Sequence, residues 1–253
     1  MSIRLVYPVG SVLKTVSQVL KRIVDQVPIV VSLDQFSIEA FSPDKVSMII
    51  TSIPSTAFEE YAVSSEVSMI ADRDELARAL KRATKRDKVT LEYVEGTREL
   101  KVKVFNVRTN LEREYSVSLS EVGFEKVGEL DVQLDVSASI PSSELIAVIK
   151  DIAIVSEEVT LMYSSELNGI KVSAHGDIGS YETVLKQFQP LTYLESSVSN
   201  VVAKYSVEHL KAIAKLLDLV DECNIAFGSD KPLKISFDIS GGGKVSVWIA
   251  PRS

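Results

Sequence analysis

Basic side chains recur at the spacing of helix turns in four segments of this 253-residue chain. At about 100° per residue, Leu76 and Leu80 fall on one side of the second segment. Arg78, Lys81 and Lys85 fall on the opposite side. Lysine and arginine gathered on a helix face attract anionic groups such as phosphates. The repeated pattern therefore predicts a surface for a polyanion.

The charges are unevenly divided between these four segments and the rest of the chain. The chain contains 28 bases and 35 acids, which gives a net charge of −7. The four segments hold 12 of the bases and 9 of the acids, so they are net +3 and the remainder is net −10. A solvated face is the ordinary explanation for one charged helix, but four alike favour nucleic-acid binding.

The elements that must position these bases are four amphipathic helices, each followed by a β-hairpin and a further strand. Residues Val89–Tyr93 and Leu100–Phe105 alternate with the period of a strand, and Glu95-Gly96-Thr97 between them has turn chemistry. The same unit recurs four times, which is typical of an internally repeated fold. The helices are expected at residues 10–26, 72–86, 142–155 and 206–221.

Two of these units make up each half of the chain. We expect an N-terminal domain at residues 1–119, an interdomain connector at 120–133 and a C-terminal domain at 134–253. The connector contains two glycines and lacks sustained periodicity, as a surface-crossing linker does. Each half then combines antiparallel sheets with two helices on one face, which is an α+β fold.

Few residues suggest catalysis or metal binding. The histidines, His175 and His209, have no metal-ligand pattern nearby, and a single cysteine, Cys223, excludes an internal disulfide. The Gly241–Lys244 segment leads into a strand, so a hairpin turn is favoured over a phosphate-binding loop. The chain shows no membrane-spanning stretch and no signal peptide, so a soluble intracellular protein without metal or cofactor is expected.

Three short motifs follow one another along the chain, namely Gly10-Ser11-Val12-Leu13-Lys14, Ser42-Pro43-Asp44-Lys45-Val46-Ser47 and Trp248-Ile249-Ala250-Pro251-Arg252. Their order, together with the fourfold unit, resembles the DNA sliding clamps of the proliferating cell nuclear antigen family, most closely its archaeal members. The resemblance covers essentially the whole chain. It implies two similar clamp domains per subunit and three subunits in a ring, with helices lining a central hole and antiparallel sheets outside. It also implies a non-catalytic polymerase processivity factor in DNA replication and repair.

The resemblance also implies a set of DNA-facing bases, and helical geometry alone adds four more. Ala147 stands where some members of the family have a further base, so the third helix contributes less. The bases implied by the resemblance are Lys14, Lys21, Arg78, Lys81, Lys150 and Lys215. The bases added by geometry are Arg22, Arg82, Lys85 and Lys211.

Two protein-binding surfaces follow from the same resemblance. Glu129 and Leu130 replace a more apolar pair that is expected beside the first of them. The partner pocket maps onto Phe41, Lys45, Val46, Met48, Val127, Pro232, Trp248, Ile249, Ala250 and Pro251. The subunit interface is expected at two open sheet edges, strands 111–119 and 180–188, through Leu111, Arg113, Tyr115, Val117, Tyr181, Val184 and Lys186.

The implied partners are double-stranded DNA, other clamp subunits, a clamp loader, DNA polymerase, flap endonuclease and DNA ligase, in the cytoplasm at the nucleoid. The sequence leaves open whether the ring is a homotrimer or an assembly of paralogues. Two other classes share some of these features. A non-ring DNA-binding protein would carry the same basic helices, and a nucleic-acid enzyme would need a carboxylate cluster for metal ions.

Overall fold

A computed structural model describes residues 2–120 and 127–252, which form two compact units. Unit 1 consists of Met1–Pro43, Ile49–Gly128 and Asp238–Val245. Unit 2 consists of Asp44–Met48, Glu129–Phe237 and Ser246–Ser253. The two units therefore differ from the two halves expected from the sequence, because each unit includes a short segment from the other half.

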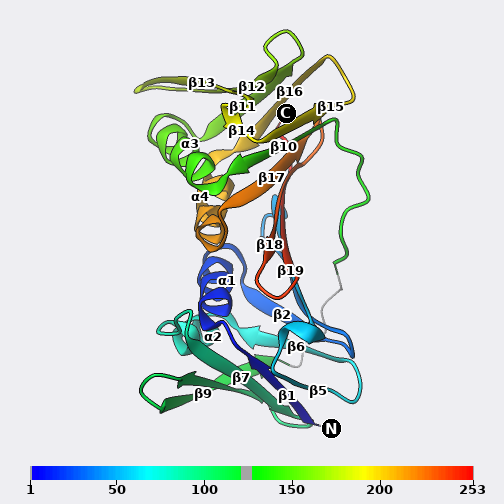
Figure 1. The fold of residues 1–253 in the computed structure, drawn as a ribbon, viewed down its shortest axis with the longest axis vertical. Helices are drawn as coiled ribbons and strands as arrows, with labels where there is room; N and C mark the ends of the chain where they lie inside the picture. Colours follow the sequence, from blue (N-terminus) through cyan, green and yellow to red (C-terminus); the bar gives the residue numbers. More distant parts are fainter. Residues whose placement is uncertain (1, 121–126, 253) are drawn as a thin grey trace. The chain divides into compact units, whose positions relative to one another are not determined.

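Unit 1 contains antiparallel strands and two helices, α1 (Gly10–Ile23) and α2 (Arg73–Leu80) (Figure 1). The helices pack against each other, and α2 also packs against β6, β8 and β9. The strands lie in the order β4-β3-β2-β6-β9-β8-β7-β1-β5. Their bounds are β1 (Ser2–Tyr7), β2 (Gln26–Val31), β3 (Gln35–Phe41), β4 (Ser47–Pro54), β5 (Glu60–Ala62), β6 (Val67–Asp72), β7 (Asp87–Val94), β8 (Glu99–Asn106) and β9 (Leu111–Ser120), with a 3₁₀ turn η1 at Ser55–Ala57.

Unit 2 repeats this plan with α3 (Ser142–Val155) and α4 (Val207–Ile213), which continues as the 3₁₀ helix η2 (Ala214–Leu219). Helix α3 packs against α4, β12 and β13 (Figure 1). The strands lie in the orders β15-β10-β17-β18-β19 and β14-β13-β12-β11-β16. Their bounds are β10 (Val136–Pro141), β11 (Glu158–Ser164), β12 (Gly169–Gly176), β13 (Gly179–Gln187), β14 (Pro190–Leu191), β15 (Tyr193–Ser196), β16 (Asn200–Ser206), β17 (Glu222–Phe227), β18 (Leu233–Ile239) and β19 (Gly243–Ile249).

The expected hairpins are present in all four repeats, as β2–β3, β7–β8, β11–β12 and β17–β18. The α+β class is confirmed. The structure adds a strand before each helix, namely β1, β6, β10 and β16, that the sequence analysis did not identify. The Gly241–Lys244 segment forms the expected turn, because Gly241 and Gly242 adopt positive φ angles of 85° and 81° between β18 and β19.

The apolar faces expected for the four helices are buried, which confirms the helical pattern. Burying one large aliphatic side chain contributes roughly 1.5–3 kcal/mol, so these faces hold the helices on their sheets. The buried residues are Val12, Val16, Val19 and Ile23 in α1, Leu76 and Leu80 in α2, Leu145, Ile149 and Ile152 in α3, and Leu210, Ile213 and Leu217 in α4 and η2.

Helix α2 ends six residues before the expected boundary. The backbone N–H of Ala83 bonds to the carbonyl of Leu80 at 2.9 Å, and the N–H of Thr84 bonds to the buried Asp87 carboxylate at 2.8 Å. These bonds form a turn that leads into β7 and stops the helix. The expected helical positions of Arg82 and Lys85 were therefore wrong, because both lie beyond α2.

Gly10 allows α1 to begin against that same turn. The N–H of Ser11 bonds to the carbonyl of Thr84 at 3.1 Å. A Cβ atom on Gly10 would lie 2.9 Å from the carbonyl oxygen of Asp87, closer than carbon and oxygen tolerate. Glycine at the start of the first motif therefore fixes the position of α1 beside the end of α2.

Candidate nucleic-acid and partner interfaces

A surface hollow between α1 and α2 gathers four of the candidate bases in unit 1. Two come from α1 and two from α2 and its C-cap, and Asp74 is the one acid among them. Four cations facing one hollow form a site for anions such as phosphates. The hollow is lined by Gln18, Lys21, Arg22, Asp74, Ala77, Arg78 and Lys81.

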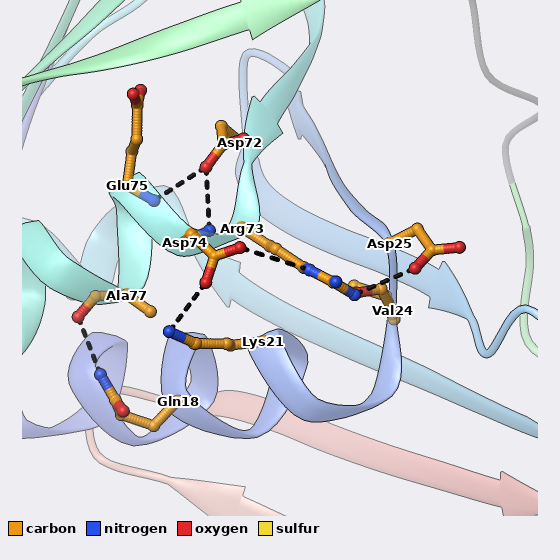
Figure 2. Close-up of polar contacts among 9 residues, drawn as sticks. All are labelled: Gln18, Lys21, Val24, Asp25, Asp72, Arg73, Asp74, Glu75 and Ala77. Atoms are coloured by element: carbon orange, nitrogen blue, oxygen red, sulfur yellow. Dashed lines mark hydrogen bonds and ion pairs between the residues drawn. The ribbon is translucent and has the colours of Figure 1, made fainter.

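Polar contacts hold α1 and α2 in this arrangement (Figure 2). Gln18 on α1 donates to the carbonyl of Ala77 on α2 at 2.8 Å. Arg73 at the start of α2 donates to the carbonyl of Val24 just after α1 at 2.6 Å, and to Asp25 at 3.0 Å. The first turn of α2 is capped by Asp72 Oδ1, which accepts from the N–H groups of Asp74 and Glu75 at 2.9 and 2.8 Å.

Lys21 makes an ion pair within the hollow. Its Nζ lies 2.7 Å from Asp74 Oδ1, and both side chains are about half exposed, at 48% and 47%. The hydrogen bond from Lys21 lowers the pKa of Asp74, and the nearby charge of Arg73 acts in the same direction. The Asp74 carboxylate is therefore ionised at neutral pH.

In unit 2 the candidate bases Lys150, Lys211 and Lys215 are all exposed on α3, α4 and η2 respectively. Ala147 on α3 is also exposed. Helix α3 thus presents one candidate base where α1 presents three, and its smaller contribution to DNA binding stays a prediction.

The candidate partner residues divide between the two units. Phe41, which is 41% exposed, and Val127 belong to unit 1. They line one hollow there, together with Asp25, Gln26, Pro28, Glu39, Ala40 and Pro43. The other eight belong to unit 2.

Within unit 2, the segment that carries Lys45 and Val46 is held in place by three contacts. The carbonyl of Val46 accepts from the N–H of Ala250 at 2.8 Å. The imidazole of His209 on α4 lies 3.0 Å from Ser47 Oγ and 3.1 Å from Asp44 Oδ2. The sequence carries no pattern that signals a contact between His209 and residues more than 160 positions away.

Three of the candidate partner residues, Met48, Trp248 and Ile249, are buried at 2%, 3% and 0% exposure. These three side chains therefore belong to the core of unit 2. Ile249 is fully enclosed, whereas the polar side chains of Glu129 and Lys234 cover the Trp248 indole. The accessible members in unit 2 are Lys45, Val46, Pro232, Ala250 and Pro251.

Glu129 and Lys234 lie against the Trp248 indole. The indole N–H donates to Glu129 Oε2 at 3.1 Å, Lys234 Nζ donates to the same oxygen at 3.2 Å, and the ammonium lies 4.7 Å from the indole ring centroid. Burial acts to raise the pKa of Glu129, but hydrogen bonds from Ser246, Lys234 and Trp248 and the charge of Lys234 lower it overall. Glu129 is thus an ionised cover for Trp248.

Strand β9 has an open edge. It pairs with β8 from Leu111 to Ser118, and on its other side it pairs with β6 only at its last two residues. The N–H of Leu119 bonds to the carbonyl of Arg98, so alternate residues from Leu119 backwards point their backbone groups at β8. The backbone N–H of Glu114 and of Ser116 therefore faces the open edge.

Strand β13 has a similar edge. It pairs with β12 along its length and with the two-residue β14 at its end. Gln187 N–H bonds to Asn168 across the hairpin, whereas Lys186 N–H bonds outward to Gln189. By the same alternation, the N–H of Val184 faces the open edge.

The candidate interface side chains are unequal in exposure. Leu111 and Lys186 are exposed, and Arg113, Tyr115, Tyr181 and Val184 are half-buried. Val117 is fully buried, so it belongs to the core of unit 1 rather than to an exposed surface.

Across residues 2–120 and 127–252, no group of three or more histidine, cysteine or acidic side chains is arranged to hold a metal ion. In the same residues, no helix is long and apolar enough to span a membrane. Cys223 is buried, and burial raises the pKa of its thiol to about 11.

Two family models together match nearly the whole chain. The N-terminal domain of proliferating cell nuclear antigen matches residues 3–126, and its C-terminal domain matches residues 128–252. The chain is 27% identical to a DNA polymerase sliding clamp of Thermofilum pendens, with 99% of both chains covered. It is 28% identical to DNA polymerase sliding clamp 2 of Sulfurisphaera tokodaii, with 92% of both chains covered.

The fold is also similar to a crystal structure of PCNA from Thermococcus kodakaraensis. The TM-score is 0.88 at 23% sequence identity, and the match covers 99% of this chain and 100% of the other.

Proposed function

The chain belongs to the proliferating cell nuclear antigen family of DNA sliding clamps, and from this we propose that three subunits close into a ring that encircles duplex DNA. A sliding clamp is a processivity factor, because it tethers a polymerase to the template it copies. The observation that carries the DNA-binding part is the gathering of Lys21, Arg22, Arg78 and Lys81 on α1 and α2, in a chain whose net charge is −7.

Phosphate contacts suit a protein that must move along DNA. Lysine and arginine bind the phosphates of any sequence, whereas side chains that read bases would hold the ring at preferred sites. In our proposal Lys14, Lys150, Lys211 and Lys215 extend this surface. Arg82 and Lys85 follow α2 and do not line the hollow, so their place on the DNA-facing surface stays a prediction.

Ring closure is proposed to join the open edge of β9 in one subunit to the open edge of β13 in the next. Each edge leaves backbone donors and acceptors free to pair, and head-to-tail pairing generates a closed ring when the rotation permits. Subunits related in this way can be identical copies or paralogues.

The clamp is further proposed to recruit a clamp loader, DNA polymerase, flap endonuclease and DNA ligase, without catalytic activity of its own. These enzymes would dock short peptide segments on the accessible partner residues, as linear motifs do in other complexes. In this proposal residues 120–133 connect domains 1–119 and 134–253, and residues 121–126 of that connector lie outside the described residues. The clamp would act in the cytoplasm at the nucleoid.

The native mass of the assembly tests the ring proposal. The chain, alone or mixed with related subunits from the same organism, should form a species of three subunits, each near the 27.8 kDa of this chain. Three copies of this chain would identify a homotrimer, and one copy beside two paralogues would identify a heterotrimer. A species that remains monomeric in both settings would contradict the ring.

We expect Val46→Glu to weaken binding of a partner peptide at least tenfold, which corresponds to about 1.4 kcal/mol. Val46 is half-buried in unit 2, so a carboxylate there would face the apolar side chain of a docked peptide without solvent to satisfy it. Titration of a fluorescent peptide copied from a clamp-binding segment of a polymerase measures the effect.

Val46→Thr is the matched control, because it keeps the shape of valine and should retain most of the affinity. Trp248→Ala is less informative, since the indole is buried and its loss would disturb folding as well. Equal peptide affinity for Val46→Glu and for the unmodified ring would remove Val46 from the partner surface.

A further inference from the structure

We propose that Asp74 competes with DNA phosphates for Lys21. This competition keeps the affinity of the clamp for DNA low enough for the clamp to slide. The inference rests on the proposed function, in which the hollow between α1 and α2 faces DNA. It assigns a role to the one acid among the side chains that line this hollow.

The geometry places Asp74 where a phosphate would otherwise bind. Its Oδ1 lies 2.7 Å from Lys21 Nζ, and its Oδ2 lies 3.7 Å from Arg73 Nε (Figure 2). Arg22, Arg78 and Lys81 line the same hollow, so the carboxylate is surrounded by cations that attract phosphate. An anion arriving from solvent therefore meets Lys21 already paired.

The side chain of Asp74 is not needed to hold the helices together. Asp72 caps α2, Gln18 joins α1 to the carbonyl of Ala77, and Arg73 joins α2 to the carbonyl of Val24 (Figure 2). The Asp74 side chain pairs with Lys21 and Arg73, and about half of it is exposed. An acid in this place adds little to the fold but changes the charge that DNA encounters.

The exposed position allows rapid exchange. Because both partners reach solvent, Lys21 can leave Asp74 for a phosphate and return to Asp74 when that phosphate moves away. The carboxylate then replaces each departing phosphate, so that a step along DNA does not leave the ammonium without an anion. A hollow lined only by cations would hold each phosphate longer.

The test compares assembled rings that carry Asp74→Asn with unmodified rings. Asparagine keeps the size of aspartate but removes its charge, so Lys21 would bind phosphate without competition. We expect duplex DNA to bind several-fold more tightly, with a salt dependence steeper by up to roughly 0.9 for each additional phosphate that the ring neutralises. We also expect slower diffusion of single labelled rings along stretched DNA.

Glu59→Gln is the matched control. Glu59 pairs with Lys88 at 2.6 Å on the surface of unit 1, and neither residue lines the hollow. The Glu59→Gln variant removes one negative charge from an exposed ion pair, as Asp74→Asn does. An equal gain of DNA affinity in both variants would show an effect of net charge alone and would overturn the proposal. An Asp74→Asn ring that binds DNA and diffuses along it like the unmodified ring would overturn it as well.

Lys21→Gln separates this proposal from the proposed function. If Lys21→Gln weakens DNA binding but Asp74→Asn changes nothing, the helices face DNA and only the role of Asp74 is overturned. If Lys21→Gln has no effect on DNA binding, Lys21 does not contact phosphate, and both the role of Asp74 and the place of Lys21 on the DNA-facing surface are overturned. The double variant should match Lys21→Gln alone, because Asp74 is proposed to act through Lys21.

Discussion

A proline at Ser116 or at Val184 is expected to leave the chain folded but unable to form a ring. The backbone N–H of each residue faces the open edge of its strand, so the proline removes a donor to the neighbouring subunit and leaves the bonds to β8 or β12 in place. Every interface of a homotrimer carries the change, and the proline ring also obstructs close pairing. Sedimentation velocity should show monomers, and circular dichroism should show the original strand content.

The controls for this experiment keep the backbone donor. Ser116→Ala and Val184→Thr alter the side chain at the same two positions and should still assemble. Proline at Tyr115 would not serve, because its N–H points at β8 and its loss would disturb unit 1 itself. A ring that persists with both Ser116→Pro and Val184→Pro would place the subunit interface elsewhere.

Reversing the charges of Arg78 and Lys81 together should weaken DNA binding by roughly tenfold or more at moderate salt. Both side chains line the hollow between α1 and α2, so glutamate in their place replaces phosphate attraction with repulsion. The slope of log affinity against log salt should also flatten, by roughly 0.9 for every phosphate that the variant no longer neutralises. Fluorescence anisotropy of a duplex over a series of salt concentrations measures both quantities.

The double variant Lys88→Glu and Arg108→Glu makes the same change of charge elsewhere on unit 1. Lys88 pairs with Glu59, and Arg108 lies in the turn between β8 and β9, so neither lines the hollow. This variant should bind DNA far better than the Arg78 and Lys81 variant. Equal losses in the two variants would mean that overall charge, and not the hollow, governs the interaction.

Hydrophobic periodicity was sufficient to predict the four helices, the side chains they bury and the hairpins that follow them. It failed at the end of α2, where a helical pattern of bases continues to Lys85 but the chain turns at Thr84. The buried Asp87 carboxylate binds the N–H of Thr84 and stops the helix. A side chain that binds the backbone in this way competes with the helical hydrogen bonds, and the spacing of the bases after Leu80 does not indicate it.

The protein-binding surfaces were less predictable, because they depend on contacts between distant parts of the chain. Glu129 reaches Trp248 across 119 positions, and His209 reaches Asp44 across 165 positions. Neither contact leaves a local pattern. The same applies to the strand edges, since the sequence indicates alternating side chains but not which backbone N–H groups face outward. The bonds of Leu119 and Gln187 supply that information.

The most direct test of a ring around DNA is retention on circular DNA compared with linear DNA. The clamp is loaded by its clamp loader onto a nicked circular plasmid and then washed at a salt concentration that breaks phosphate contacts. We predict that the clamp stays on the circle and is lost when a restriction enzyme opens it, because only a topological link survives the wash. Equal loss from circular and linear DNA under that wash would contradict the ring.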